Sequence, residues 1–328
     1  MSGKPSTVLL TDRAWPDDDV EREIVTQAGF EFVSGPAEPA SAELIEQLVR
    51  EHLPSAILTC WAPVTRAAIE AAPLLQVVAR MGVGLDNIDV DAATDRGVLV
   101  TNVPDYCVAE VSDHALALVL AWTRGVVTAD RAVRSGRWEP SVAHLRRLGS
   151  LTCGIVGYGR MGRETARKLG AFACTVVVTD PYPPADPGSV RFVDLATLLD
   201  TSDIVILHVP LTPATQGLID EPQLARMRPG SLLVNVSRGG LVVSSAVSAS
   251  LARGHLGGAA LDVLDSEPQV PPDLLTHEDV VITPHIAFSS DLSLLDLRRG
   301  AANEVVRVLR GEPAHHARNR PVMGGVRA

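Results

Sequence analysis

Three polar residues late in the chain have the types that the reduction of a 2-keto acid requires. Arg238, Glu267 and His285 each follow a short apolar run that predicts a β-strand. In an open parallel sheet, ligands bind beyond the carboxyl ends of the strands, where these side chains would lie. A guanidinium binds a carboxylate through two hydrogen bonds, and an imidazole donates a proton near neutral pH. Each residue alone is more often structural, but the set indicates acid–base catalysis on a small acid.

Two histidines compete for the role of proton donor. A neighbouring carboxylate favours the protonated imidazole, so we expect Glu267 to keep His285 ready to donate. His208 also follows a predicted strand, but it lies nearer the middle of the predicted domain, where the adenine side of a cofactor would pass. We therefore assign His208 to the cofactor site or to a structural role.

A glycine-rich loop provides a site for a dinucleotide. Residues 157–162 read Gly-Tyr-Gly-Arg-Met-Gly, after an apolar strand and before a helix. In that context Gly157 allows the tight turn, Gly159 lets the backbone approach the pyrophosphate, and Gly162 lets helix and strand pack closely. The next predicted strand ends at Asp180, whose carboxylate would bind the ribose hydroxyls and repel a 2′-phosphate. The sequence therefore favours NAD over NADP.

A glycine-containing turn in the N-terminal half is a candidate anion site. Residues 80–87 follow a predicted strand, and two glycines flank Val83. Backbone N–H groups in such a turn bind anions, although a purely structural turn fits equally well. The side chain of Arg80 is either only structural or has one of two functional directions. Directed into a site, it would favour substrates with a second acidic group, whereas paired with Asp86 or another acid it would leave apolar keto acids preferred.

The elements that must position these groups follow from the pattern of the chain. From residue 7 to 103, five short β-branched runs alternate with amphipathic segments, and from residue 151 six more strand candidates alternate with helices. This alternation predicts parallel sheets covered on both faces. We expect an α/β fold with two doubly wound, Rossmann-like or flavodoxin-like domains and a cleft between them. A buried helix is predicted over 108–121, an irregular connection over 134–148 and an amphipathic helix over 290–310.

The composition is that of an ordinary globular protein. The 328 residues, 46% of them hydrophobic, are enough for two cores. A net charge of −10 without a local Lys/Arg cluster argues against nucleic acid. No apolar run approaches the roughly 20 residues of a membrane helix, and the N-terminus is too polar for a signal peptide. Four scattered cysteines indicate reduced thiols in the cytoplasm, and no metal site is expected.

Taken together, the motifs resemble those of the D-isomer-specific 2-hydroxyacid dehydrogenases over nearly the whole chain. Within that family the chain is most similar to the branch of C-terminal-binding-protein-like and phosphoglycerate-dehydrogenase-like enzymes. The segments that carry the resemblance are residues 80–87, 102–107, 109–114, 157–162, 180–182, 208–212, 237–240, 262–268 and 283–288.

The resemblance implies a role for each matching residue. It makes His285 the general acid and base, Glu267 its partner, and Arg238 the ligand of the substrate carboxylate and carbonyl. It places Asp262 at the nicotinamide carboxamide. The substrate site would comprise Arg80, Val83, Gly84 and Phe288. The NAD site would comprise Gly157, Gly159, Arg160, Met161, Gly162, Asp180, His208, Val209, Pro210, Thr215, Val236, Ser237 and Asp262.

The resemblance also implies a domain organisation and leaves alternatives for function. Residues 1–103 would begin the substrate-binding domain, 104–286 would form the NAD-binding domain, and 287–328 would return to the first; a homodimer would form through the NAD-binding domains. The alternatives are an NAD(H)-sensing regulator similar to the C-terminal-binding proteins, or a formate or phosphite dehydrogenase. Formate enzymes usually pair the histidine with glutamine, so Glu267 weighs against formate.

Overall fold

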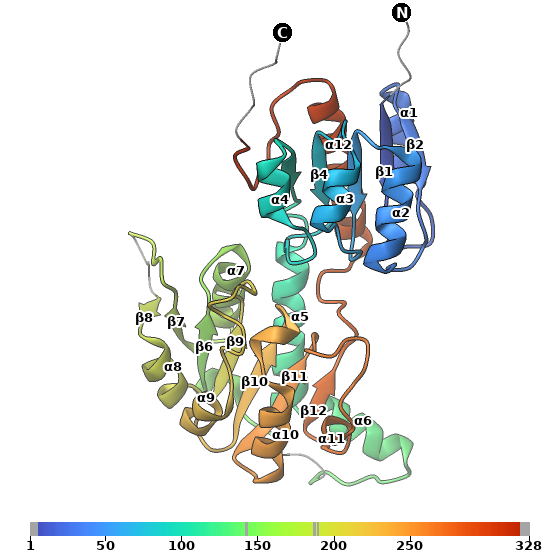
Figure 1. The fold of residues 1–328 in the computed structure, drawn as a ribbon. Coiled ribbons are helices and arrows are strands. Elements are labelled where there is room, and N and C mark those ends of the chain that lie inside the picture. The colour runs from blue at the N-terminus through green and yellow to red at the C-terminus, as the bar shows by residue number, and fades with distance from the viewer. Residues whose placement is uncertain (1–5, 142–143, 186–187, 189, 322–328) are drawn as a thin grey trace, which may run out of the picture. The chain divides into compact units, whose positions relative to one another are not determined.

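The computed structural model describes residues 6–141, 144–185, 188 and 190–321, and its chain divides into two compact units (Figure 1). The first, here called the split domain, consists of Met1–Tyr106 and Ser290–Ala328. The second, here called the central domain, is Cys107–Ser289. Each contains one parallel sheet with helices on both faces, which confirms the predicted α/β fold class.

The split domain has a five-stranded sheet in the order β2-β1-β3-β4-β5. This is the flavodoxin-like order of a doubly wound domain. Strands β1, β3 and β4 are buried on both faces, which explains why they are mostly apolar rather than alternating with polar residues; β2, at the edge of the sheet, exposes Glu31 and Ser34. They are β1 (Thr7–Leu10), β2 (Glu31–Ser34), β3 (Ala56–Thr59), β4 (Val77–Arg80) and β5 (Leu99–Thr101).

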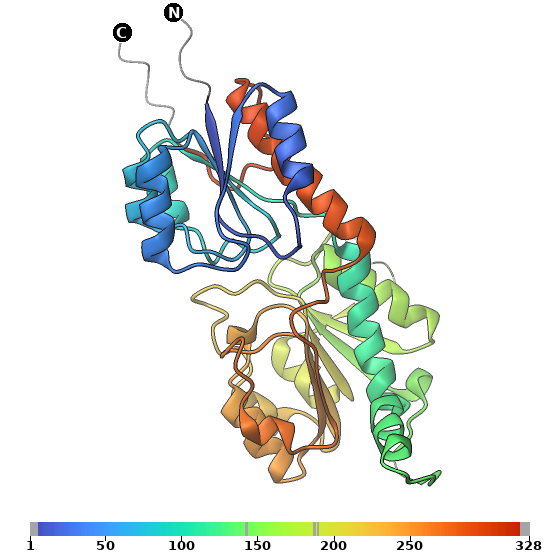
Figure 2. The same ribbon diagram turned by 90° about the vertical axis from the view of Figure 1, so that its right-hand side faces the viewer.

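Two groups of helices cover this sheet (Figure 2). On one face, Leu9, Ile57 and Val78 form a core with α2 (Ala42–His52), α3 (Arg66–Ala71) and α4 (Val90–Asp95). On the other face lie α1 (Asp19–Gln27) and α12 (Asp291–Leu309). The amphipathic helix predicted over 290–310 is therefore α12, flanked by Ser290 as N-cap and Arg310 as C-cap.

The central domain has a seven-stranded parallel sheet in the order β12-β11-β10-β9-β6-β7-β8. Six strands were expected; the seventh, β8, is only two residues long, too short to be recognised as an apolar run. The strand order reverses between β6 and β9, and such a switch point is where open α/β sheets bind ligands. The strands are β6 (Thr152–Val156), β7 (Thr175–Thr179), β8 (Arg191–Phe192), β9 (Ile204–Leu207), β10 (Ser231–Asn235), β11 (Leu256–Leu261) and β12 (Val280–Ile282).

Helices cover both faces of the central sheet as well. The long apolar helix α5 (Val108–Thr123) packs with α7 (Arg160–Ala171) against one face. The other face shares its core with α8 (Leu195–Thr201), α9 (Glu221–Arg226) and α10 (Ser244–Ala252).

Shorter elements complete the central domain. Helix α6 (Val126–Arg134) follows α5 and was not predicted, and α11 (Pro272–Leu275) precedes β12. Two 3₁₀ turns are Leu148–Ser150 and Gly239–Leu241. In the described part of the chain, no helix combines the length and the apolar composition needed to cross a membrane.

Candidate nucleotide-binding and catalytic site

The central domain brings most of the predicted site residues to one edge of its sheet. Arg238, Glu267 and His285 follow β10, β11 and β12, which are neighbouring parallel strands. The glycine loop follows β6, and Asp180 follows β7. Because parallel strands end at the same edge, these groups share the carboxyl edge of the sheet, as the sequence predicts.

His285 and Glu267 form a hydrogen-bonded pair. The Nδ1 atom of His285 lies 2.9 Å from Oε2 of Glu267, and Oε1 of Glu267 accepts a 2.8 Å hydrogen bond from the amide of Leu264. Partial burial raises the pKa of Glu267, but the hydrogen bond and charge of His285, with smaller contributions from Leu264 and Arg238, bring it below its ordinary value. An ionised carboxylate only accepts hydrogen bonds, so Nδ1 of His285 carries a proton.

The loop that carries Arg238 is packed directly against the loop that carries Glu267. A side chain at Gly239 would overlap the carbonyl group of Leu264, so only glycine fits there. The carbonyl of Arg238 accepts a 2.9 Å hydrogen bond from the amide side chain of Asn235, and its Nη1 donates to the Ser237 carbonyl at 2.9 Å. The charge of Arg238 is near enough to Glu267 to contribute to the lowered pKa of that carboxylate.

Asp262 orders the backbone around His285. Its side chain is 1% exposed; Oδ1 accepts hydrogen bonds from the Thr283 hydroxyl (2.6 Å) and the Ile286 amide (3.0 Å), and Oδ2 from the Ala287 amide (2.8 Å). His285 has a φ of 53°, a left-handed conformation that costs about 1–2 kcal/mol for a residue with a Cβ. These bonds hold that conformation. The resemblance predicts a contact of Asp262 with nicotinamide. The sequence analysis does not predict that Asp262 orders the loop. A signal for it exists, because Asp262 and Thr283 both directly follow strands that end at the same edge of the sheet.

Phe288 lies beside His285. Its ring centroid is 6.1 Å from that of His285, and the two rings meet edge to face at 81°. Phe288 is half-buried, so part of its ring is open to solvent. Contact of Phe288 with a substrate side chain stays a prediction.

The glycine loop fits the diphosphate of a dinucleotide. Gly157 has a φ of 96°, and a side chain at Gly162 would overlap the carbonyl of Gly157. Gly159 is the N-cap of α7, and a Cβ there would meet open space, so a ligand has room next to the first amides of the helix. These amides belong to Arg160 and Met161, the residues predicted to hold pyrophosphate.

Asp180 is held beside this loop by backbone hydrogen bonds. Its Oδ2 accepts from the amide of Tyr158 at 2.6 Å, and its Oδ1 accepts from the amide of Tyr182 at 2.7 Å. Each carboxylate oxygen has a second lone pair with which to accept from a ribose hydroxyl. The residues present therefore fit an NAD-type dinucleotide.

The remaining predicted cofactor residues mostly shape the edge of the site. His208 makes a 2.9 Å hydrogen bond from Nε2 to the Thr165 hydroxyl, and burial lowers its pKa to about 4, so it is neutral at neutral pH. The Thr215 hydroxyl donates to the carbonyl of Pro210 (2.7 Å) and the Ser237 hydroxyl to that of Leu207 (2.8 Å).

Two of these residues present apolar side chains. Val209 lies against the glycine loop, where a Cβ on Gly157 would meet its Cγ1 at 2.8 Å, and Val236 is 6% exposed at the end of β10.

In the split domain, Arg80 builds the turn that follows β4. It is 6% exposed, its Nε donates to Oδ1 of Asn87 at 3.1 Å, and its Nη1 donates to the carbonyl of Met81. A Cβ on Gly82 would come within 2.6 Å of its guanidinium. These contacts favour the structural alternative for Arg80.

The same turn presents backbone amides. Val83 is 37% exposed, and its carbonyl accepts a 2.6 Å hydrogen bond from Asn102. No atom of the described residues accepts a hydrogen bond from the amide of Val83 or Gly84. Anion binding by these two amides stays a prediction.

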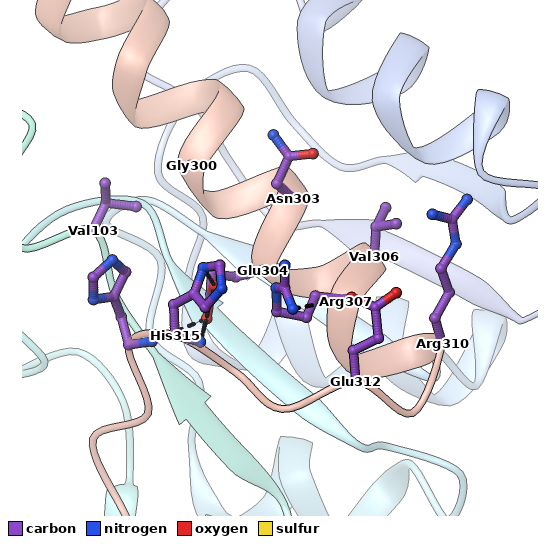
Figure 3. Close-up of a pocket in the computed structure, with 10 residues that line it drawn as sticks. Val103, Gly300, Asn303, Glu304, Val306, Arg307, Arg310, Glu312 and His315 are labelled. Atoms are coloured by element: carbon purple, nitrogen blue, oxygen red, sulfur yellow. Dashed lines mark hydrogen bonds and ion pairs between the residues drawn. The ribbon is translucent and has the colours of Figure 1, made fainter.

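The split domain also contains a separate cavity of about 400 Å³, between α12 and the segment after it (Figure 3). Its charged groups are largely satisfied within the protein. Arg307 pairs with Glu312 at 3.0 Å, and Glu304 accepts hydrogen bonds from the backbone amides of His315 and His316. None of the predicted site residues lines it.

The fold and the site define the class of protein, an α/β protein that binds a nicotinamide dinucleotide. Residues 116–287, just over half of the chain, match the model of the D-isomer-specific 2-hydroxyacid dehydrogenase NAD-binding domain. The chain belongs to the D-isomer-specific 2-hydroxyacid dehydrogenase family, in its phosphoglycerate-dehydrogenase-like branch.

Individual relatives support this assignment. The chain is 41% identical over 259 residues to a glyoxylate reductase of Korarchaeum cryptofilum, covering 76% of this chain and 78% of that protein. It is 38% identical over 282 residues to a D-3-phosphoglycerate dehydrogenase of Archaeoglobus fulgidus, covering 84% of this chain and 54% of that protein. The chain thus spans about half the length of the phosphoglycerate dehydrogenases it matches.

A solved structure agrees with these relatives. The D-lactate dehydrogenase of Aquifex aeolicus, complexed with NAD and lactic acid, superposes with a TM-score of 0.83 at 26% identity, covering 93% of this chain and 96% of that one.

Proposed function

We propose that the protein is an NAD-dependent D-2-hydroxyacid dehydrogenase, which interconverts a small 2-keto acid and its D-2-hydroxy acid. The observation that carries the proposal is the 2.9 Å pair between His285 and Glu267, beside Arg238 and in the same domain as the glycine loop. The relatives named glyoxylate reductase and D-3-phosphoglycerate dehydrogenase support this class of reaction.

Each catalytic side chain has a distinct task in this proposal. Arg238 binds the substrate carboxylate and polarises the carbonyl, and the amides of Val83 and Gly84 provide a second anchor for the carboxylate. During reduction Nε2 of His285 donates its proton to the carbonyl oxygen, and during oxidation it takes the proton back. Glu267 orients the ring through Nδ1 and stabilises its positive charge. A bound nicotinamide supplies or accepts the hydride at C2.

The central test is turnover. Purified protein with NADH and a panel of 2-keto acids should oxidise NADH, and the product should be the D-hydroxy acid by chiral chromatography. If the protein binds NADH but reduces no 2-keto acid, the proposal is wrong and a regulatory, NAD(H)-sensing role replaces it.

Asp180 should determine the choice of cofactor. A 2′-phosphate would be placed against its carboxylate, so kcat/KM should be far higher with NADH than with NADPH. Asp180→Ala should narrow this difference mainly by improving NADPH, whereas Asp200→Ala, at an exposed surface acid, should leave it unchanged. Equal kcat/KM values for both cofactors in the wild type would exclude this role of Asp180.

We propose that the substrate is a small 2-keto acid without a second acidic group, of the kind that glyoxylate represents. The contacts of Arg80 with Asn87 and Met81 commit its guanidinium to the turn. Arg80→Gln should therefore lower kcat/KM by a similar factor for every acid in the panel. Arg66→Gln, at an exposed arginine of the same domain, is the control and should change nothing. A loss confined to phosphorylated acids would instead assign Arg80 to a second acidic group.

We also propose that the protein is a homodimer formed through the central domain. Val126 (57% exposed), Val133 (49%) and Trp138 (85%) present apolar surface on and just after α6. Exposed large apolar side chains are typical of protein–protein contacts where they form a patch. Light scattering should give twice the chain mass, and Val133→Asp with Trp138→Asp should reduce it to one; a monomeric wild type would refute the dimer.

A further inference from the structure

A histidine on α5 contacts the network beneath the catalytic loop. The Nε2 atom of His114 lies 2.9 Å from the hydroxyl of Thr283 and 3.5 Å from Oδ1 of Asp262. The side chain of His114 is 19% exposed, and that of Asp262 is 1% exposed. His114 comes from the other end of the central domain sequence and has no part in the proposed chemistry.

The direction of the hydrogen bonds follows from counting protons. The Thr283 hydroxyl has one proton, which it donates to Oδ1 of Asp262 at 2.6 Å. Its oxygen must then accept from His114, so Nε2 of His114 carries a proton. The result is a directed chain from the His114 imidazole through the Thr283 hydroxyl to the Asp262 carboxylate.

This chain ends on the backbone that carries His285. Asp262 accepts from the amides of Ile286 and Ala287 through its side chain, and from the amide of His285 through its carbonyl (2.8 Å). His285 sits among these contacts at a φ of 53°, which the surrounding bonds must maintain. A group that fixes the Thr283 hydroxyl therefore helps to hold His285 in place.

The helix that carries His114 is itself firmly held. Lys168 of α7 donates from Nζ to the Ser112 hydroxyl and pairs with Asp113, both at 2.7 Å. Trp122, at the end of α5, donates to the carbonyl of Gly257 at 2.9 Å. The backbone of His114 is therefore held in place. The helix that carries it is hydrogen-bonded to α7, which begins at the glycine loop.

We propose that His114 is a positioning residue for the catalytic loop: its Nε2 proton locks Thr283 onto Asp262, and Asp262 holds the backbone of residues 285–287 so that His285 meets the substrate. The functional half of this inference rests on the proposed role of His285. The structural half, the locking of the loop, stands without it.

The first experiment measures how well the amides of the catalytic loop are protected, and it needs no turnover. Amide hydrogen exchange of Ile286 and Ala287 is measured by NMR in the full chain. His114→Leu removes one hydrogen bond from the network, so both amides should exchange about tenfold faster. His114→Gln, which keeps an N–H donor at a similar reach, should restore most of the protection. Unchanged exchange in His114→Leu would overturn the proposal.

His255→Leu is the matched control. His255 is half-buried like His114, and its Nε2 also makes a 2.9 Å hydrogen bond, to the carbonyl of Met227, but it lies away from the catalytic loop. Its replacement should leave the Ile286 and Ala287 amides as protected as in the wild type. If His255→Leu exposes them equally, the effect is general loosening of the domain and the proposal fails.

The second experiment measures the kinetics of keto acid reduction. His114→Leu should lower kcat for keto acid reduction by about 10- to 100-fold through misplacement of His285, with little change in the KM of the acid or in NADH binding. His114→Leu combined with Thr283→Val should be no slower than Thr283→Val alone, because both interrupt one chain. Additive losses, or a loss in KM only, would show that His114 does not act through Thr283.

The two measurements, amide exchange and kinetics, distinguish a failure of the proposed function from a failure of the positioning role. If the wild type reduces no 2-keto acid, the proposed function falls while amide exchange still decides whether His114 locks the loop. If the wild type is active and the exchange is unmoved by His114→Leu, only the positioning role is refuted. Should His114→Leu not fold, Thr283→Val breaks the same chain one bond further on and is judged by the same exchange.

Discussion

The segments after β9 and after β12 present the same residue type at equivalent places of one sheet, yet in different chemical states. His208, after β9, is hydrogen-bonded to the Thr165 hydroxyl, and burial lowers its pKa to about 4. His285, after β12, lies 2.9 Å from the carboxylate of Glu267. A strand end therefore places a histidine near ligands, but the partner differs, a hydroxyl for His208 and a carboxylate for His285.

The backbone differs between the two segments as well. His285 adopts a φ of 53° and is held by amide contacts to Asp262, whereas His208 continues the sheet register, with its amide donating to Val156 at 2.7 Å. Backbone held away from its preferred conformation is typical of functional sites. The comparison thus assigns chemistry to the segment after β12 and a lining role to the one after β9.

Replacing the two histidines in turn is the most direct test of their different roles. His285→Ala should lower kcat of keto acid reduction by roughly 10²–10⁴-fold, the usual contribution of general acid catalysis, with NADH affinity nearly unchanged. His208→Ala should act mainly on the KM for NADH. Steady-state kinetics with fluorescence titration of NADH measures both, and a larger kcat loss in His208→Ala would reverse the two assignments.

The pH dependence tests the partner of His285. Reduction uses the protonated imidazole, so its rate should hold at low pH and fall as the pH rises. The lowered pKa of Glu267 keeps the carboxylate charged throughout this range. Glu267→Gln removes that charge, so the fall should move to lower pH. Profiles of kcat/KM decide the point, and superimposable profiles would mean that Glu267 is not the partner.

The state of His208 predicts a pH-dependent stability. Its pKa rises from about 4 in the folded protein to its ordinary 6.5 on unfolding, so between these values the unfolded chain binds more protons. The His208 contribution to stability is complete above pH 6.5 and is lost as the pH falls towards 4. Urea unfolding should show a shallower decline for His208→Gln than for wild type. His144→Gln, at an exposed histidine, should follow the wild type; identical declines in all three would refute the buried neutral state.

The smallest expected effect concerns the ring that packs against His285. Phe288→Leu keeps an apolar side chain but removes the edge-to-face contact, which is worth about 0.5–1.5 kcal/mol. The contact orients His285, so the transition-state stabilisation of small keto acids, measured as kcat/KM, should weaken by at most that amount. No change at all would place Phe288 outside the substrate site.

Much of the fold could be predicted because its signals are local. The glycine loop, the strand ending at Asp180 and the apolar runs each depend on neighbouring residues, and the α/β class follows from their alternation. Two elements were missed. Helix α6 has an amphipathic pattern that the sequence analysis did not use, and β8 is stabilised by pairing with β7 rather than by its own composition.

The candidate site divides in the same way. Arg238, Glu267 and His285 could be selected because strand ends of a parallel sheet converge, and this rule needs only the order of the elements. Three contacts could not be predicted in this way. They are the hydrogen bonds of Asp262 with the backbone and Thr283, the hydrogen bond of Thr283 with His114, and the hydrogen bond of Arg80 with Asn87. Each depends on side-chain directions across segments separated along the chain.

The sequence by itself therefore determined the α/β class, the nucleotide loop and the residue types available for acid–base chemistry, because these depend on periodicity and short motifs. Only the tertiary structure decided which histidine is buried against a hydroxyl, which carboxylate holds the backbone of a loop and which arginine is buried in a turn. The physical reason is that protonation and hydrogen bonding depend on distances of a few ångströms between residues that only the packed fold brings together.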